Sequence, residues 1–194
     1  MQETGEDRAG DIWSSKKQRE DESRLAPDSP EQPSRLLLAG LAFDLVGPVV
    51  LAQAADGFLE YQPHTRYKGF GRDRLNPYGL GPFCKFKVGG LPAGPGLYAF
   101  VIDGVPVYVG KTEDFRGRMG PVNYGSISPV NCYGKGQSTN CKINSGVLQA
   151  AKAGRRVAVY VHRTSNLGLE GAVIAVVRPP WNGRQASGIS LPAA

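Results

Sequence analysis

Cysteine is scarce in this sequence of 194 residues, and its few thiols are not closely spaced. The chain has three, Cys84, Cys132 and Cys141, and an odd number without dense spacing argues against a disulfide framework. A reducing, cytoplasmic setting is the simpler expectation. Zinc binding by these thiols with His162 is a weaker alternative, because no Cys-x-x-C pair is present. We therefore expect the thiols to be buried.

Long apolar runs are also few, and residues 36–55 form the one stretch that approaches the thickness of a bilayer. Asp44 lies near its middle, and a central Asp costs about 2.5–3.5 kcal/mol in membrane insertion. We therefore expect no membrane contact, and a helix or helix pair over residues 36–60. A protein anchored to a membrane by this stretch is the less favoured alternative.

Acidic residues are unevenly distributed. Residues 1–35 hold nine acids and six bases, a net charge of −3, whereas the remainder carries +9. The first segment is too polar to offset chain entropy by burial, so we expect a disordered charged tail over 1–35, and a second tail over 185–194. A basic folded part is compatible with a polyanionic partner, although many basic domains bind no nucleic acid.

The expected folded part has two sections. Residues 36–93 form a helical and loop extension, in which the Gly- and Pro-rich part from residue 61 is either a solvated loop or a DNA contact. Residues 94–184 form the main domain. There Asp103-Gly104 predicts a hairpin between strands 96–102 and 105–109, and alternating valines predict a strand over 157–162. Helices are expected over 112–119, 144–153 and 166–177. The expected fold class is α/β: a small three-stranded antiparallel sheet flanked by helices, with an N-terminal helical extension.

Two short motifs and two longer spacings carry the functional signal. Gly96-Leu97-Tyr98 is followed by Tyr108-Val109-Gly110, and Arg118 stands ten residues after Tyr108. Downstream, Glu170 and Asn182 are twelve residues apart, and Asn182 ends the run Arg178-Pro179-Pro180-Trp181-Asn182. This combined pattern resembles the GIY-YIG nuclease superfamily, and in particular its members of restriction-endonuclease type.

The resemblance implies a metal-dependent endonuclease that hydrolyses phosphodiester bonds in DNA. The catalytic residues that it implies are Tyr98, Tyr108, Lys111, Arg118, Glu170 and Asn182, with Glu170 as the ligand of Mg²⁺ or Mn²⁺. The chemistry agrees, because an arginine fork matches two phosphate oxygens and a hard cation often takes only one or two protein carboxylates. Glu170 is the only acid after Asp114. The alternative is a catalytically inactive DNA-binding module.

The general base stays open at this point. A free Tyr has a pKa of about 10, which is too high for an efficient base near neutrality. We expect Lys111, Arg118 and metal-bound water to lower the pKa of the paired tyrosines, or Lys111 to hold the water itself. Some members of the superfamily carry a His four residues after the Arg, but this sequence has Val122 there.

Residues 123–142 are long for a connection and rich in Asn, Ser and Lys, so they resemble a DNA-contacting insertion. Either Asn123 or Tyr124, close after Val122, is available to replace the missing His. The residues that we expect to bind nucleic acid are Arg116, Asn123, Tyr124, Lys135 and Lys142.

Overall fold

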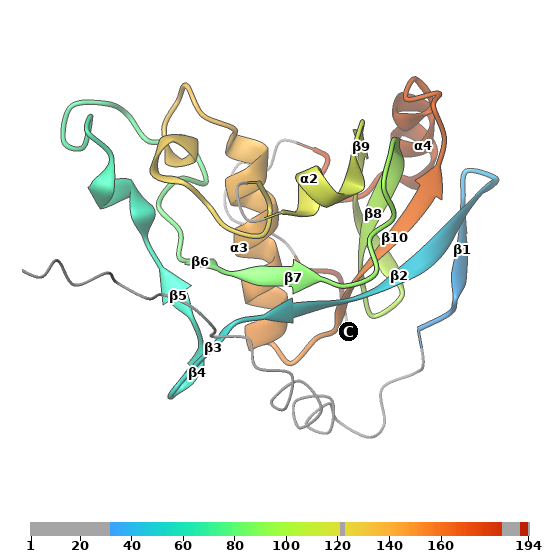
Figure 1. Ribbon diagram of the computed structural model, residues 1–194, viewed down its shortest axis with the longest axis horizontal. Helices are drawn as coiled ribbons and strands as arrows, with labels where there is room; N and C mark the ends of the chain where they lie inside the picture. The colour runs from blue at the N-terminus through green and yellow to red at the C-terminus, as the bar shows by residue number, and fades with distance from the viewer. Residues whose placement is uncertain (1–31, 121–122, 184–190, 194) are drawn as a thin grey trace, which may run out of the picture. The chain divides into compact units, whose positions relative to one another are not determined.

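An antiparallel sheet dominates the computed structural model, which describes residues 32–120, 123–183 and 191–193 (Figure 1). The strands follow the order β1-β2-β10-β8-β9, and β7 pairs with the distal part of β2. Their bounds are β1 (Arg35–Leu38), β2 (Leu41–Leu51), β7 (Phe86–Val88), β8 (Gly96–Ile102), β9 (Val105–Thr112) and β10 (Val157–Arg163). The described residues belong to one compact unit, Gln32–Ala194.

Helices and short strand pairs connect and cover this sheet. The helices of the described residues are α2 (Phe115–Met119), α3 (Ser138–Lys152) and α4 (Leu169–Val177), with the 3₁₀ turns η2 (Pro63–Arg66) and η3 (Pro129–Cys132). Two further ladders join β3 (Gln53–Ala54) to β4 (Gly57–Phe58) and β5 (Glu60–Tyr61) to β6 (Phe83–Cys84).

The expected fold class is wrong in two respects. Residues 36–60 are strands and not a helical extension, and the sheet is a curled one of six strands and not a small one of three. The tight turn that starts β2 uses Ala39 and Gly40, whose φ angles of 50° and 78° are both positive. Two such residues give the twist that a two-residue hairpin needs. The run lacks strict alternation because even exposed positions in it, such as Leu37 and Val50, carry apolar side chains, so the pattern does not indicate a strand.

The curl of the sheet starts within β2. Gly47 has a φ of 155°, and the register between β2 and β10 shifts between Val159 and Tyr160. A bulge of this kind bends a strand and increases its twist. Beyond it, Val49–Leu51 leave β10 and pair with β7. The sheet therefore curls along β2 and surrounds one side of α3 (Figure 1).

Side chains alternate between the two faces of the sheet. In β8, Tyr98, Phe100 and Ile102 belong to the core cluster that includes Ile143 and Val147 of α3. Leu97, Ala99 and Val101 belong to the opposite cluster, which includes Val173 of α4. All seven residues of β8 are buried. Because strand side chains alternate, this one strand supplies both cores.

The local expectations for the second half of the chain fare better. The hairpin of β8 and β9 and the strand β10 are confirmed. The three helices are present with different bounds: α2 begins after Asp114, whose side chain accepts a hydrogen bond from Gly117 N, and α3 begins at Ser138 and not at Asn144. The Gly- and Pro-rich segment is partly packed, since Tyr61, Tyr67 and Tyr78 lie against a third core cluster with Phe83, Ile127, Cys132, Tyr133 and Cys141.

Some sequence expectations concern other parts of the chain. The charged tail lies outside the described residues except for 32–35, and the C-terminal tail lies outside them except for Leu191–Ala193. Leu191 packs against the core cluster beneath α3. Within the described ranges, no helix has both the length and the apolarity needed to cross a membrane.

We expect two glycine substitutions in helices to have opposite effects on stability. A Cβ on Gly146 of α3 would lie 2.6 Å from the Trp181 ring, whereas one on Gly171 of α4 would meet nothing within 4 Å. Gly146→Ala should lower the free energy of unfolding by about 1–3 kcal/mol through overpacking. Gly171→Ala should raise it by about 0.5–1 kcal/mol through helix propensity. Urea denaturation of both variants tests this, and a stabilised Gly146→Ala would contradict the packing described.

Candidate active site

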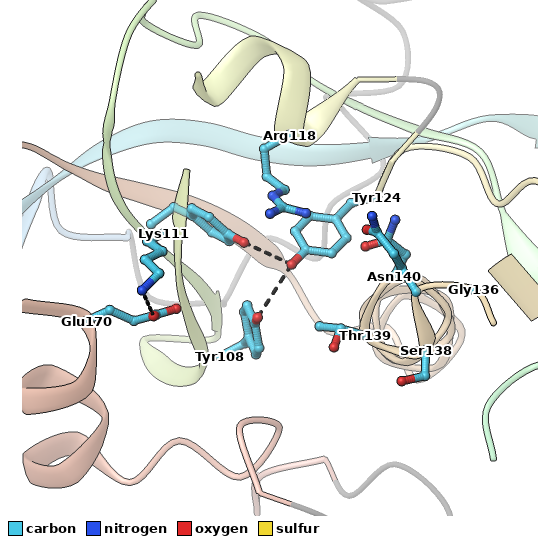
Figure 2. A pocket seen from close by; sticks show the side chains of 11 residues that line it. Tyr108, Lys111, Arg118, Tyr124, Gly136, Ser138, Thr139, Asn140 and Glu170 are labelled. Atoms are coloured by element: carbon cyan, nitrogen blue, oxygen red, sulfur yellow. Dashed lines mark hydrogen bonds and ion pairs between the residues drawn. The ribbon is translucent and has the colours of Figure 1, made fainter. Parts of the chain in front are cut away.

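A pocket of about 410 Å³ opens between the β8–β9 hairpin and the first turn of α3 (Figure 2). Sequence-distant segments line it, from β8, β9, α2, the segment after α2, the start of α3 and α4. The lining residues are Tyr98, Tyr108, Lys111, Arg118, Tyr124, Gly136, Gln137, Ser138, Thr139, Asn140 and Glu170. Five of the six expected catalytic residues are among them.

Three tyrosine hydroxyls meet at the centre of this pocket. Tyr98 Oη and Tyr124 Oη are 2.8 Å apart, and Tyr124 Oη donates a longer hydrogen bond of 3.5 Å to Tyr108 Oη. The Tyr98 and Tyr108 ring centroids are 6.1 Å apart, because both side chains project from the same face of the hairpin. Tyr124 is 1% exposed and lies between the other two hydroxyls (Figure 2). The expectation that Tyr98 and Tyr108 share one face is confirmed.

Neighbouring residues fix the positions of these rings. Tyr98 lies opposite Gly110 in the β8–β9 register, and a Cβ on Gly110 would lie 2.5 Å from Tyr98 Oη. The second motif glycine therefore leaves the space that the Tyr98 ring occupies. Asn144 of α3 is fully buried and donates to the carbonyl oxygens of Tyr124 (2.8 Å) and Cys84 (2.9 Å). This amide holds the Tyr124 segment against α3.

Burial raises the pKa of all three hydroxyls above the ordinary tyrosine value. For Tyr98 and Tyr108 burial is the main cause, and a neighbouring tyrosine adds to it. Burial also dominates for Tyr124, although the Arg118 charge acts to lower the pKa of Tyr98 and Tyr124. The expected net lowering is therefore not found, since desolvation outweighs the cation. At neutral pH the three phenols are protonated and can donate hydrogen bonds.

Arg118 covers one side of this tyrosine cluster. It lies in the last turn of α2, and its guanidinium carbon is 5.5 Å from the centroid of the Tyr124 ring. A guanidinium over an aromatic face is attracted by the ring and kept in orientation. Arg116 is directed elsewhere, since its Nε donates to Leu91 O at 3.1 Å. The two arginines of the short helix thus have separate surroundings.

Among the described residues that line the pocket, one carries a carboxylate, and it is paired with a lysine. Lys111 Nζ of β9 lies 3.1 Å from Glu170 Oε2 of α4, and the side chains are 49% and 22% exposed. Both residues line the pocket, on the side of Tyr108 away from α3 (Figure 2). Glu170 is the residue of this pocket that can offer a carboxylate to a metal ion.

Asn182 does not line the pocket. Its side-chain amide donates to Val109 O at 2.7 Å and its Oδ1 accepts from Val109 N at 2.8 Å. Trp181 N donates to Val107 O beside it. Asn182 therefore bonds to β9 as a neighbouring strand would. Asn182 holds Val109 and Trp181 holds Val107, the two neighbours of Tyr108, so Asn182 is a positioning residue for Tyr108.

The residues expected to bind nucleic acid fall into different surroundings. Lys142 is 5% exposed and donates to Trp181 O and Gly183 O, both at 2.6 Å, so it supports the segment before the C-terminal tail. Asn123 donates to Gly117 O at 2.8 Å. Lys135 is exposed beside Gly136. Tyr124 belongs to the tyrosine cluster, and of the two residues near the missing His it is the one that reaches the pocket.

Sequence reasoning missed the first turn of α3 as part of this site. The sequence predicts a connecting loop over residues 137–140, whereas α3 begins at Ser138 and its first turn lines the pocket. Ser138 and Thr139 are residue types that favour helix starts, and this signal was available in the sequence.

The thiols and His162 do not form a metal site. All three cysteines are free and buried, and burial raises the pKa of Cys84 to about 12. His162 Nδ1 is bonded to Ala42 O at 2.9 Å. Among the residues that the structure describes, no three His, Cys, Asp or Glu side chains gather as a metal-binding group.

No family model, no curated protein and no solved structure matches this chain.

Proposed function

We propose that this protein is a metal-dependent endonuclease of GIY-YIG type that hydrolyses phosphodiester bonds in DNA. One observation carries the proposal. Tyr98, Tyr108, Lys111, Arg118 and Glu170 are spread over 73 positions of sequence, and they line a single pocket. Each of these residue types is common alone, but their meeting in one pocket at the spacings of that superfamily favours a shared chemical task.

The charges of the pocket suit a phosphodiester. Arg118 and Lys111 contribute two positive charges and Glu170 one negative charge, so the side chains carry a net charge of +1. Arg118 presents a planar fork that can donate to two phosphate oxygens. Its contact with the Tyr124 ring holds the fork before substrate arrives, and a preorganised donor stabilises charge that develops in the transition state.

The donor set fits a hard cation with few protein ligands. Glu170 supplies one partly exposed carboxylate, and a cation such as Mg²⁺ is commonly held by one or two carboxylates together with waters and phosphate. When bound, Mg²⁺ or Mn²⁺ neutralises charge on the phosphate and on the leaving oxygen. Lys111 Nζ, paired with Glu170, keeps this carboxylate directed into the pocket.

The hydroxyl cluster orients the reacting groups. Because the three phenols are protonated, Tyr108 Oη, the least buried of them, can donate to a phosphate oxygen or to the attacking water. Tyr124 donates a hydrogen bond to that hydroxyl, and Tyr124 is itself hydrogen-bonded to Tyr98. The protein's part in the reaction is thus mainly positioning and electrostatic stabilisation.

Nicking of supercoiled plasmid DNA in the presence of Mg²⁺ tests the proposal. We expect cleavage that stops when the metal is chelated. DNA binding without any cleavage, with both Mg²⁺ and Mn²⁺, would instead favour the inactive DNA-binding module.

Arg118 and Arg116 should differ sharply in their effect on turnover. Arg118→Ala removes the donor over Tyr124 and should lower the cleavage rate by about 10²–10³-fold, with a modest loss of affinity. Arg118→Lys should also be poor, since a point charge does not replace the fork. Arg116→Ala removes the same charge outside the pocket and should largely preserve the rate. Single-turnover rates decide, and equal losses for the two alanine variants would contradict the assignment.

Glu170→Gln should abolish cleavage while DNA binding persists. The change removes the carboxylate that Glu170 contributes to the pocket but hardly alters the side-chain volume, so folding is preserved. Affinity for DNA should stay equal or rise, because one negative charge is lost. Glu113→Gln, at an exposed position, is the matched control and should cleave normally. Full activity of Glu170→Gln at ordinary Mg²⁺ concentrations would refute the metal assignment.

Tyr124→Phe should lower turnover by about 10²-fold and leave the fold intact. The variant keeps the ring beneath Arg118 but removes the hydroxyl between Tyr98 and Tyr108. Tyr160→Phe is the control, because it also removes a phenol hydroxyl, one that donates to Pro33 O on the opposite face of the sheet. Tyr160→Phe should lose about 0.5–1.5 kcal/mol of stability for its one hydrogen bond, and Tyr124→Phe about twice that for its two. A Tyr124→Phe enzyme as fast as Tyr160→Phe would show that the hydroxyl is not needed.

A further inference from the structure

The first turn of α3 forms a wall of the pocket that the proposed chemistry does not use. Gln137, Ser138, Thr139 and Asn140 all line the pocket there. The first amides of a helix have no acceptor within the helix. Gln137, the residue that precedes α3, provides no side-chain cap for them. The turn also has no acidic residue, so no side chain of the turn neutralises the positive end of this 15-residue helix, which faces the pocket.

A buried amide in this turn supplies a second, independent observation. Asn140 is 1% exposed, and its Nδ2 has no hydrogen-bond partner among the residues that the structure describes. A buried donor without an acceptor is costly, and native proteins rarely keep one without a reason. Thr139 and Asn140 lie on the side of α3 that faces Tyr108 and Tyr124 (Figure 2). An oxygen-rich anion in the pocket would satisfy this donor and the free amides together.

We propose that the first turn of α3 is a phosphate-binding subsite that takes a backbone phosphate adjacent to the scissile one. The inference rests on the proposed nuclease function. Helix N-termini with free amides bind phosphate through those amides and the helix dipole. A side chain at position 136 would clash with the backbone of Val130 and Asn131. Gly136 therefore leaves the approach to the turn open.

The position of the turn separates its phosphate from the reacting one. The scissile phosphate must lie near Glu170, where the metal is proposed to bind. Thr139 and Asn140 lie across the pocket from the Lys111–Glu170 pair, with Tyr108 and Tyr124 between the two sides (Figure 2). The α3 turn therefore contacts a neighbouring phosphate and positions the strand, and its donors contribute to affinity more than to turnover.

Thr139→Asp tests the subsite in the full-length chain. Thr139 is exposed and faces the pocket, and an acid in the first turn of a helix stabilises the helix while it repels phosphate. We expect the Kd for duplex DNA, measured in the absence of divalent metal, to rise about tenfold. The slope of log Kd against log salt concentration should fall by about the contribution of one phosphate contact. The rate at saturating DNA should fall much less than the affinity. Asn140→Ala should weaken binding in the same direction.

Gln149→Glu is the matched control, because it adds the same charge to the same helix at an exposed position near the other end. It should bind DNA within about twofold of the unmodified protein. Equal affinities for Thr139→Asp and Gln149→Glu would overturn the subsite even if the protein cleaves DNA. A large rate loss with unchanged affinity would overturn it too, since the turn would then contact the scissile phosphate. If the protein binds DNA without cleaving it, weaker binding by Thr139→Asp alone would support the subsite while the nuclease function fails.

Discussion

The contact between three buried tyrosine hydroxyls is the constraint on which the site depends. A hydroxyl removed from water must find a partner inside the protein, and Tyr98, Tyr124 and Tyr108 find one in each other. Two of them come from the hairpin and the third from the segment held by Asn144 of α3. The cluster therefore joins the sheet to α3, and the pocket exists where these two parts meet.

Stability and proposed chemistry make opposite demands on this cluster. Burial raises the pKa of each phenol, which keeps it neutral and lets the rings pack within the core beneath α3. The same burial makes a tyrosinate expensive, so Arg118 alone does not produce one. In the proposed chemistry the charges come from groups at the rim of the cluster, Arg118 on one side and the Lys111–Glu170 pair on the other. A hydrophobic core can carry a polar site in this way because its buried members stay uncharged.

Local sequence signals predicted the hairpin and most of the site, but not the sheet. Asp103-Gly104 specifies its turn by backbone conformation alone. Tyr98 and Tyr108 share a face because the register shifts between Phe100 and Val101, where β9 has one extra residue, and the sequence does not show this irregularity. The pairing of β2 with β10 is a contact between residues more than 100 positions apart, so no local pattern encodes it. Residues 36–60 resemble a helix in sequence because apolar side chains also occupy exposed strand positions such as Leu37 and Val50, which removes the alternation. The spacing of Asn182 from Glu170 likewise predicts a residue close to the site, but spacing does not distinguish an amide that positions the backbone from one that takes part in catalysis.

The two walls of the pocket differ in how a sequence specifies them. The hairpin wall depends on particular side chains at fixed spacings, which can be read from the residues. The α3 wall depends on backbone amides and a helix end, and these belong to any sequence that starts a helix there. A change of side chain on the hairpin wall would alter the proposed catalytic chemistry. The α3 wall, to bind phosphate as proposed, needs a first turn without a side-chain cap or an acid, and space in front of it. Because Asn140 is buried and without an acceptor in the described structure, the second wall retains a cost of desolvation that a bound phosphate would remove.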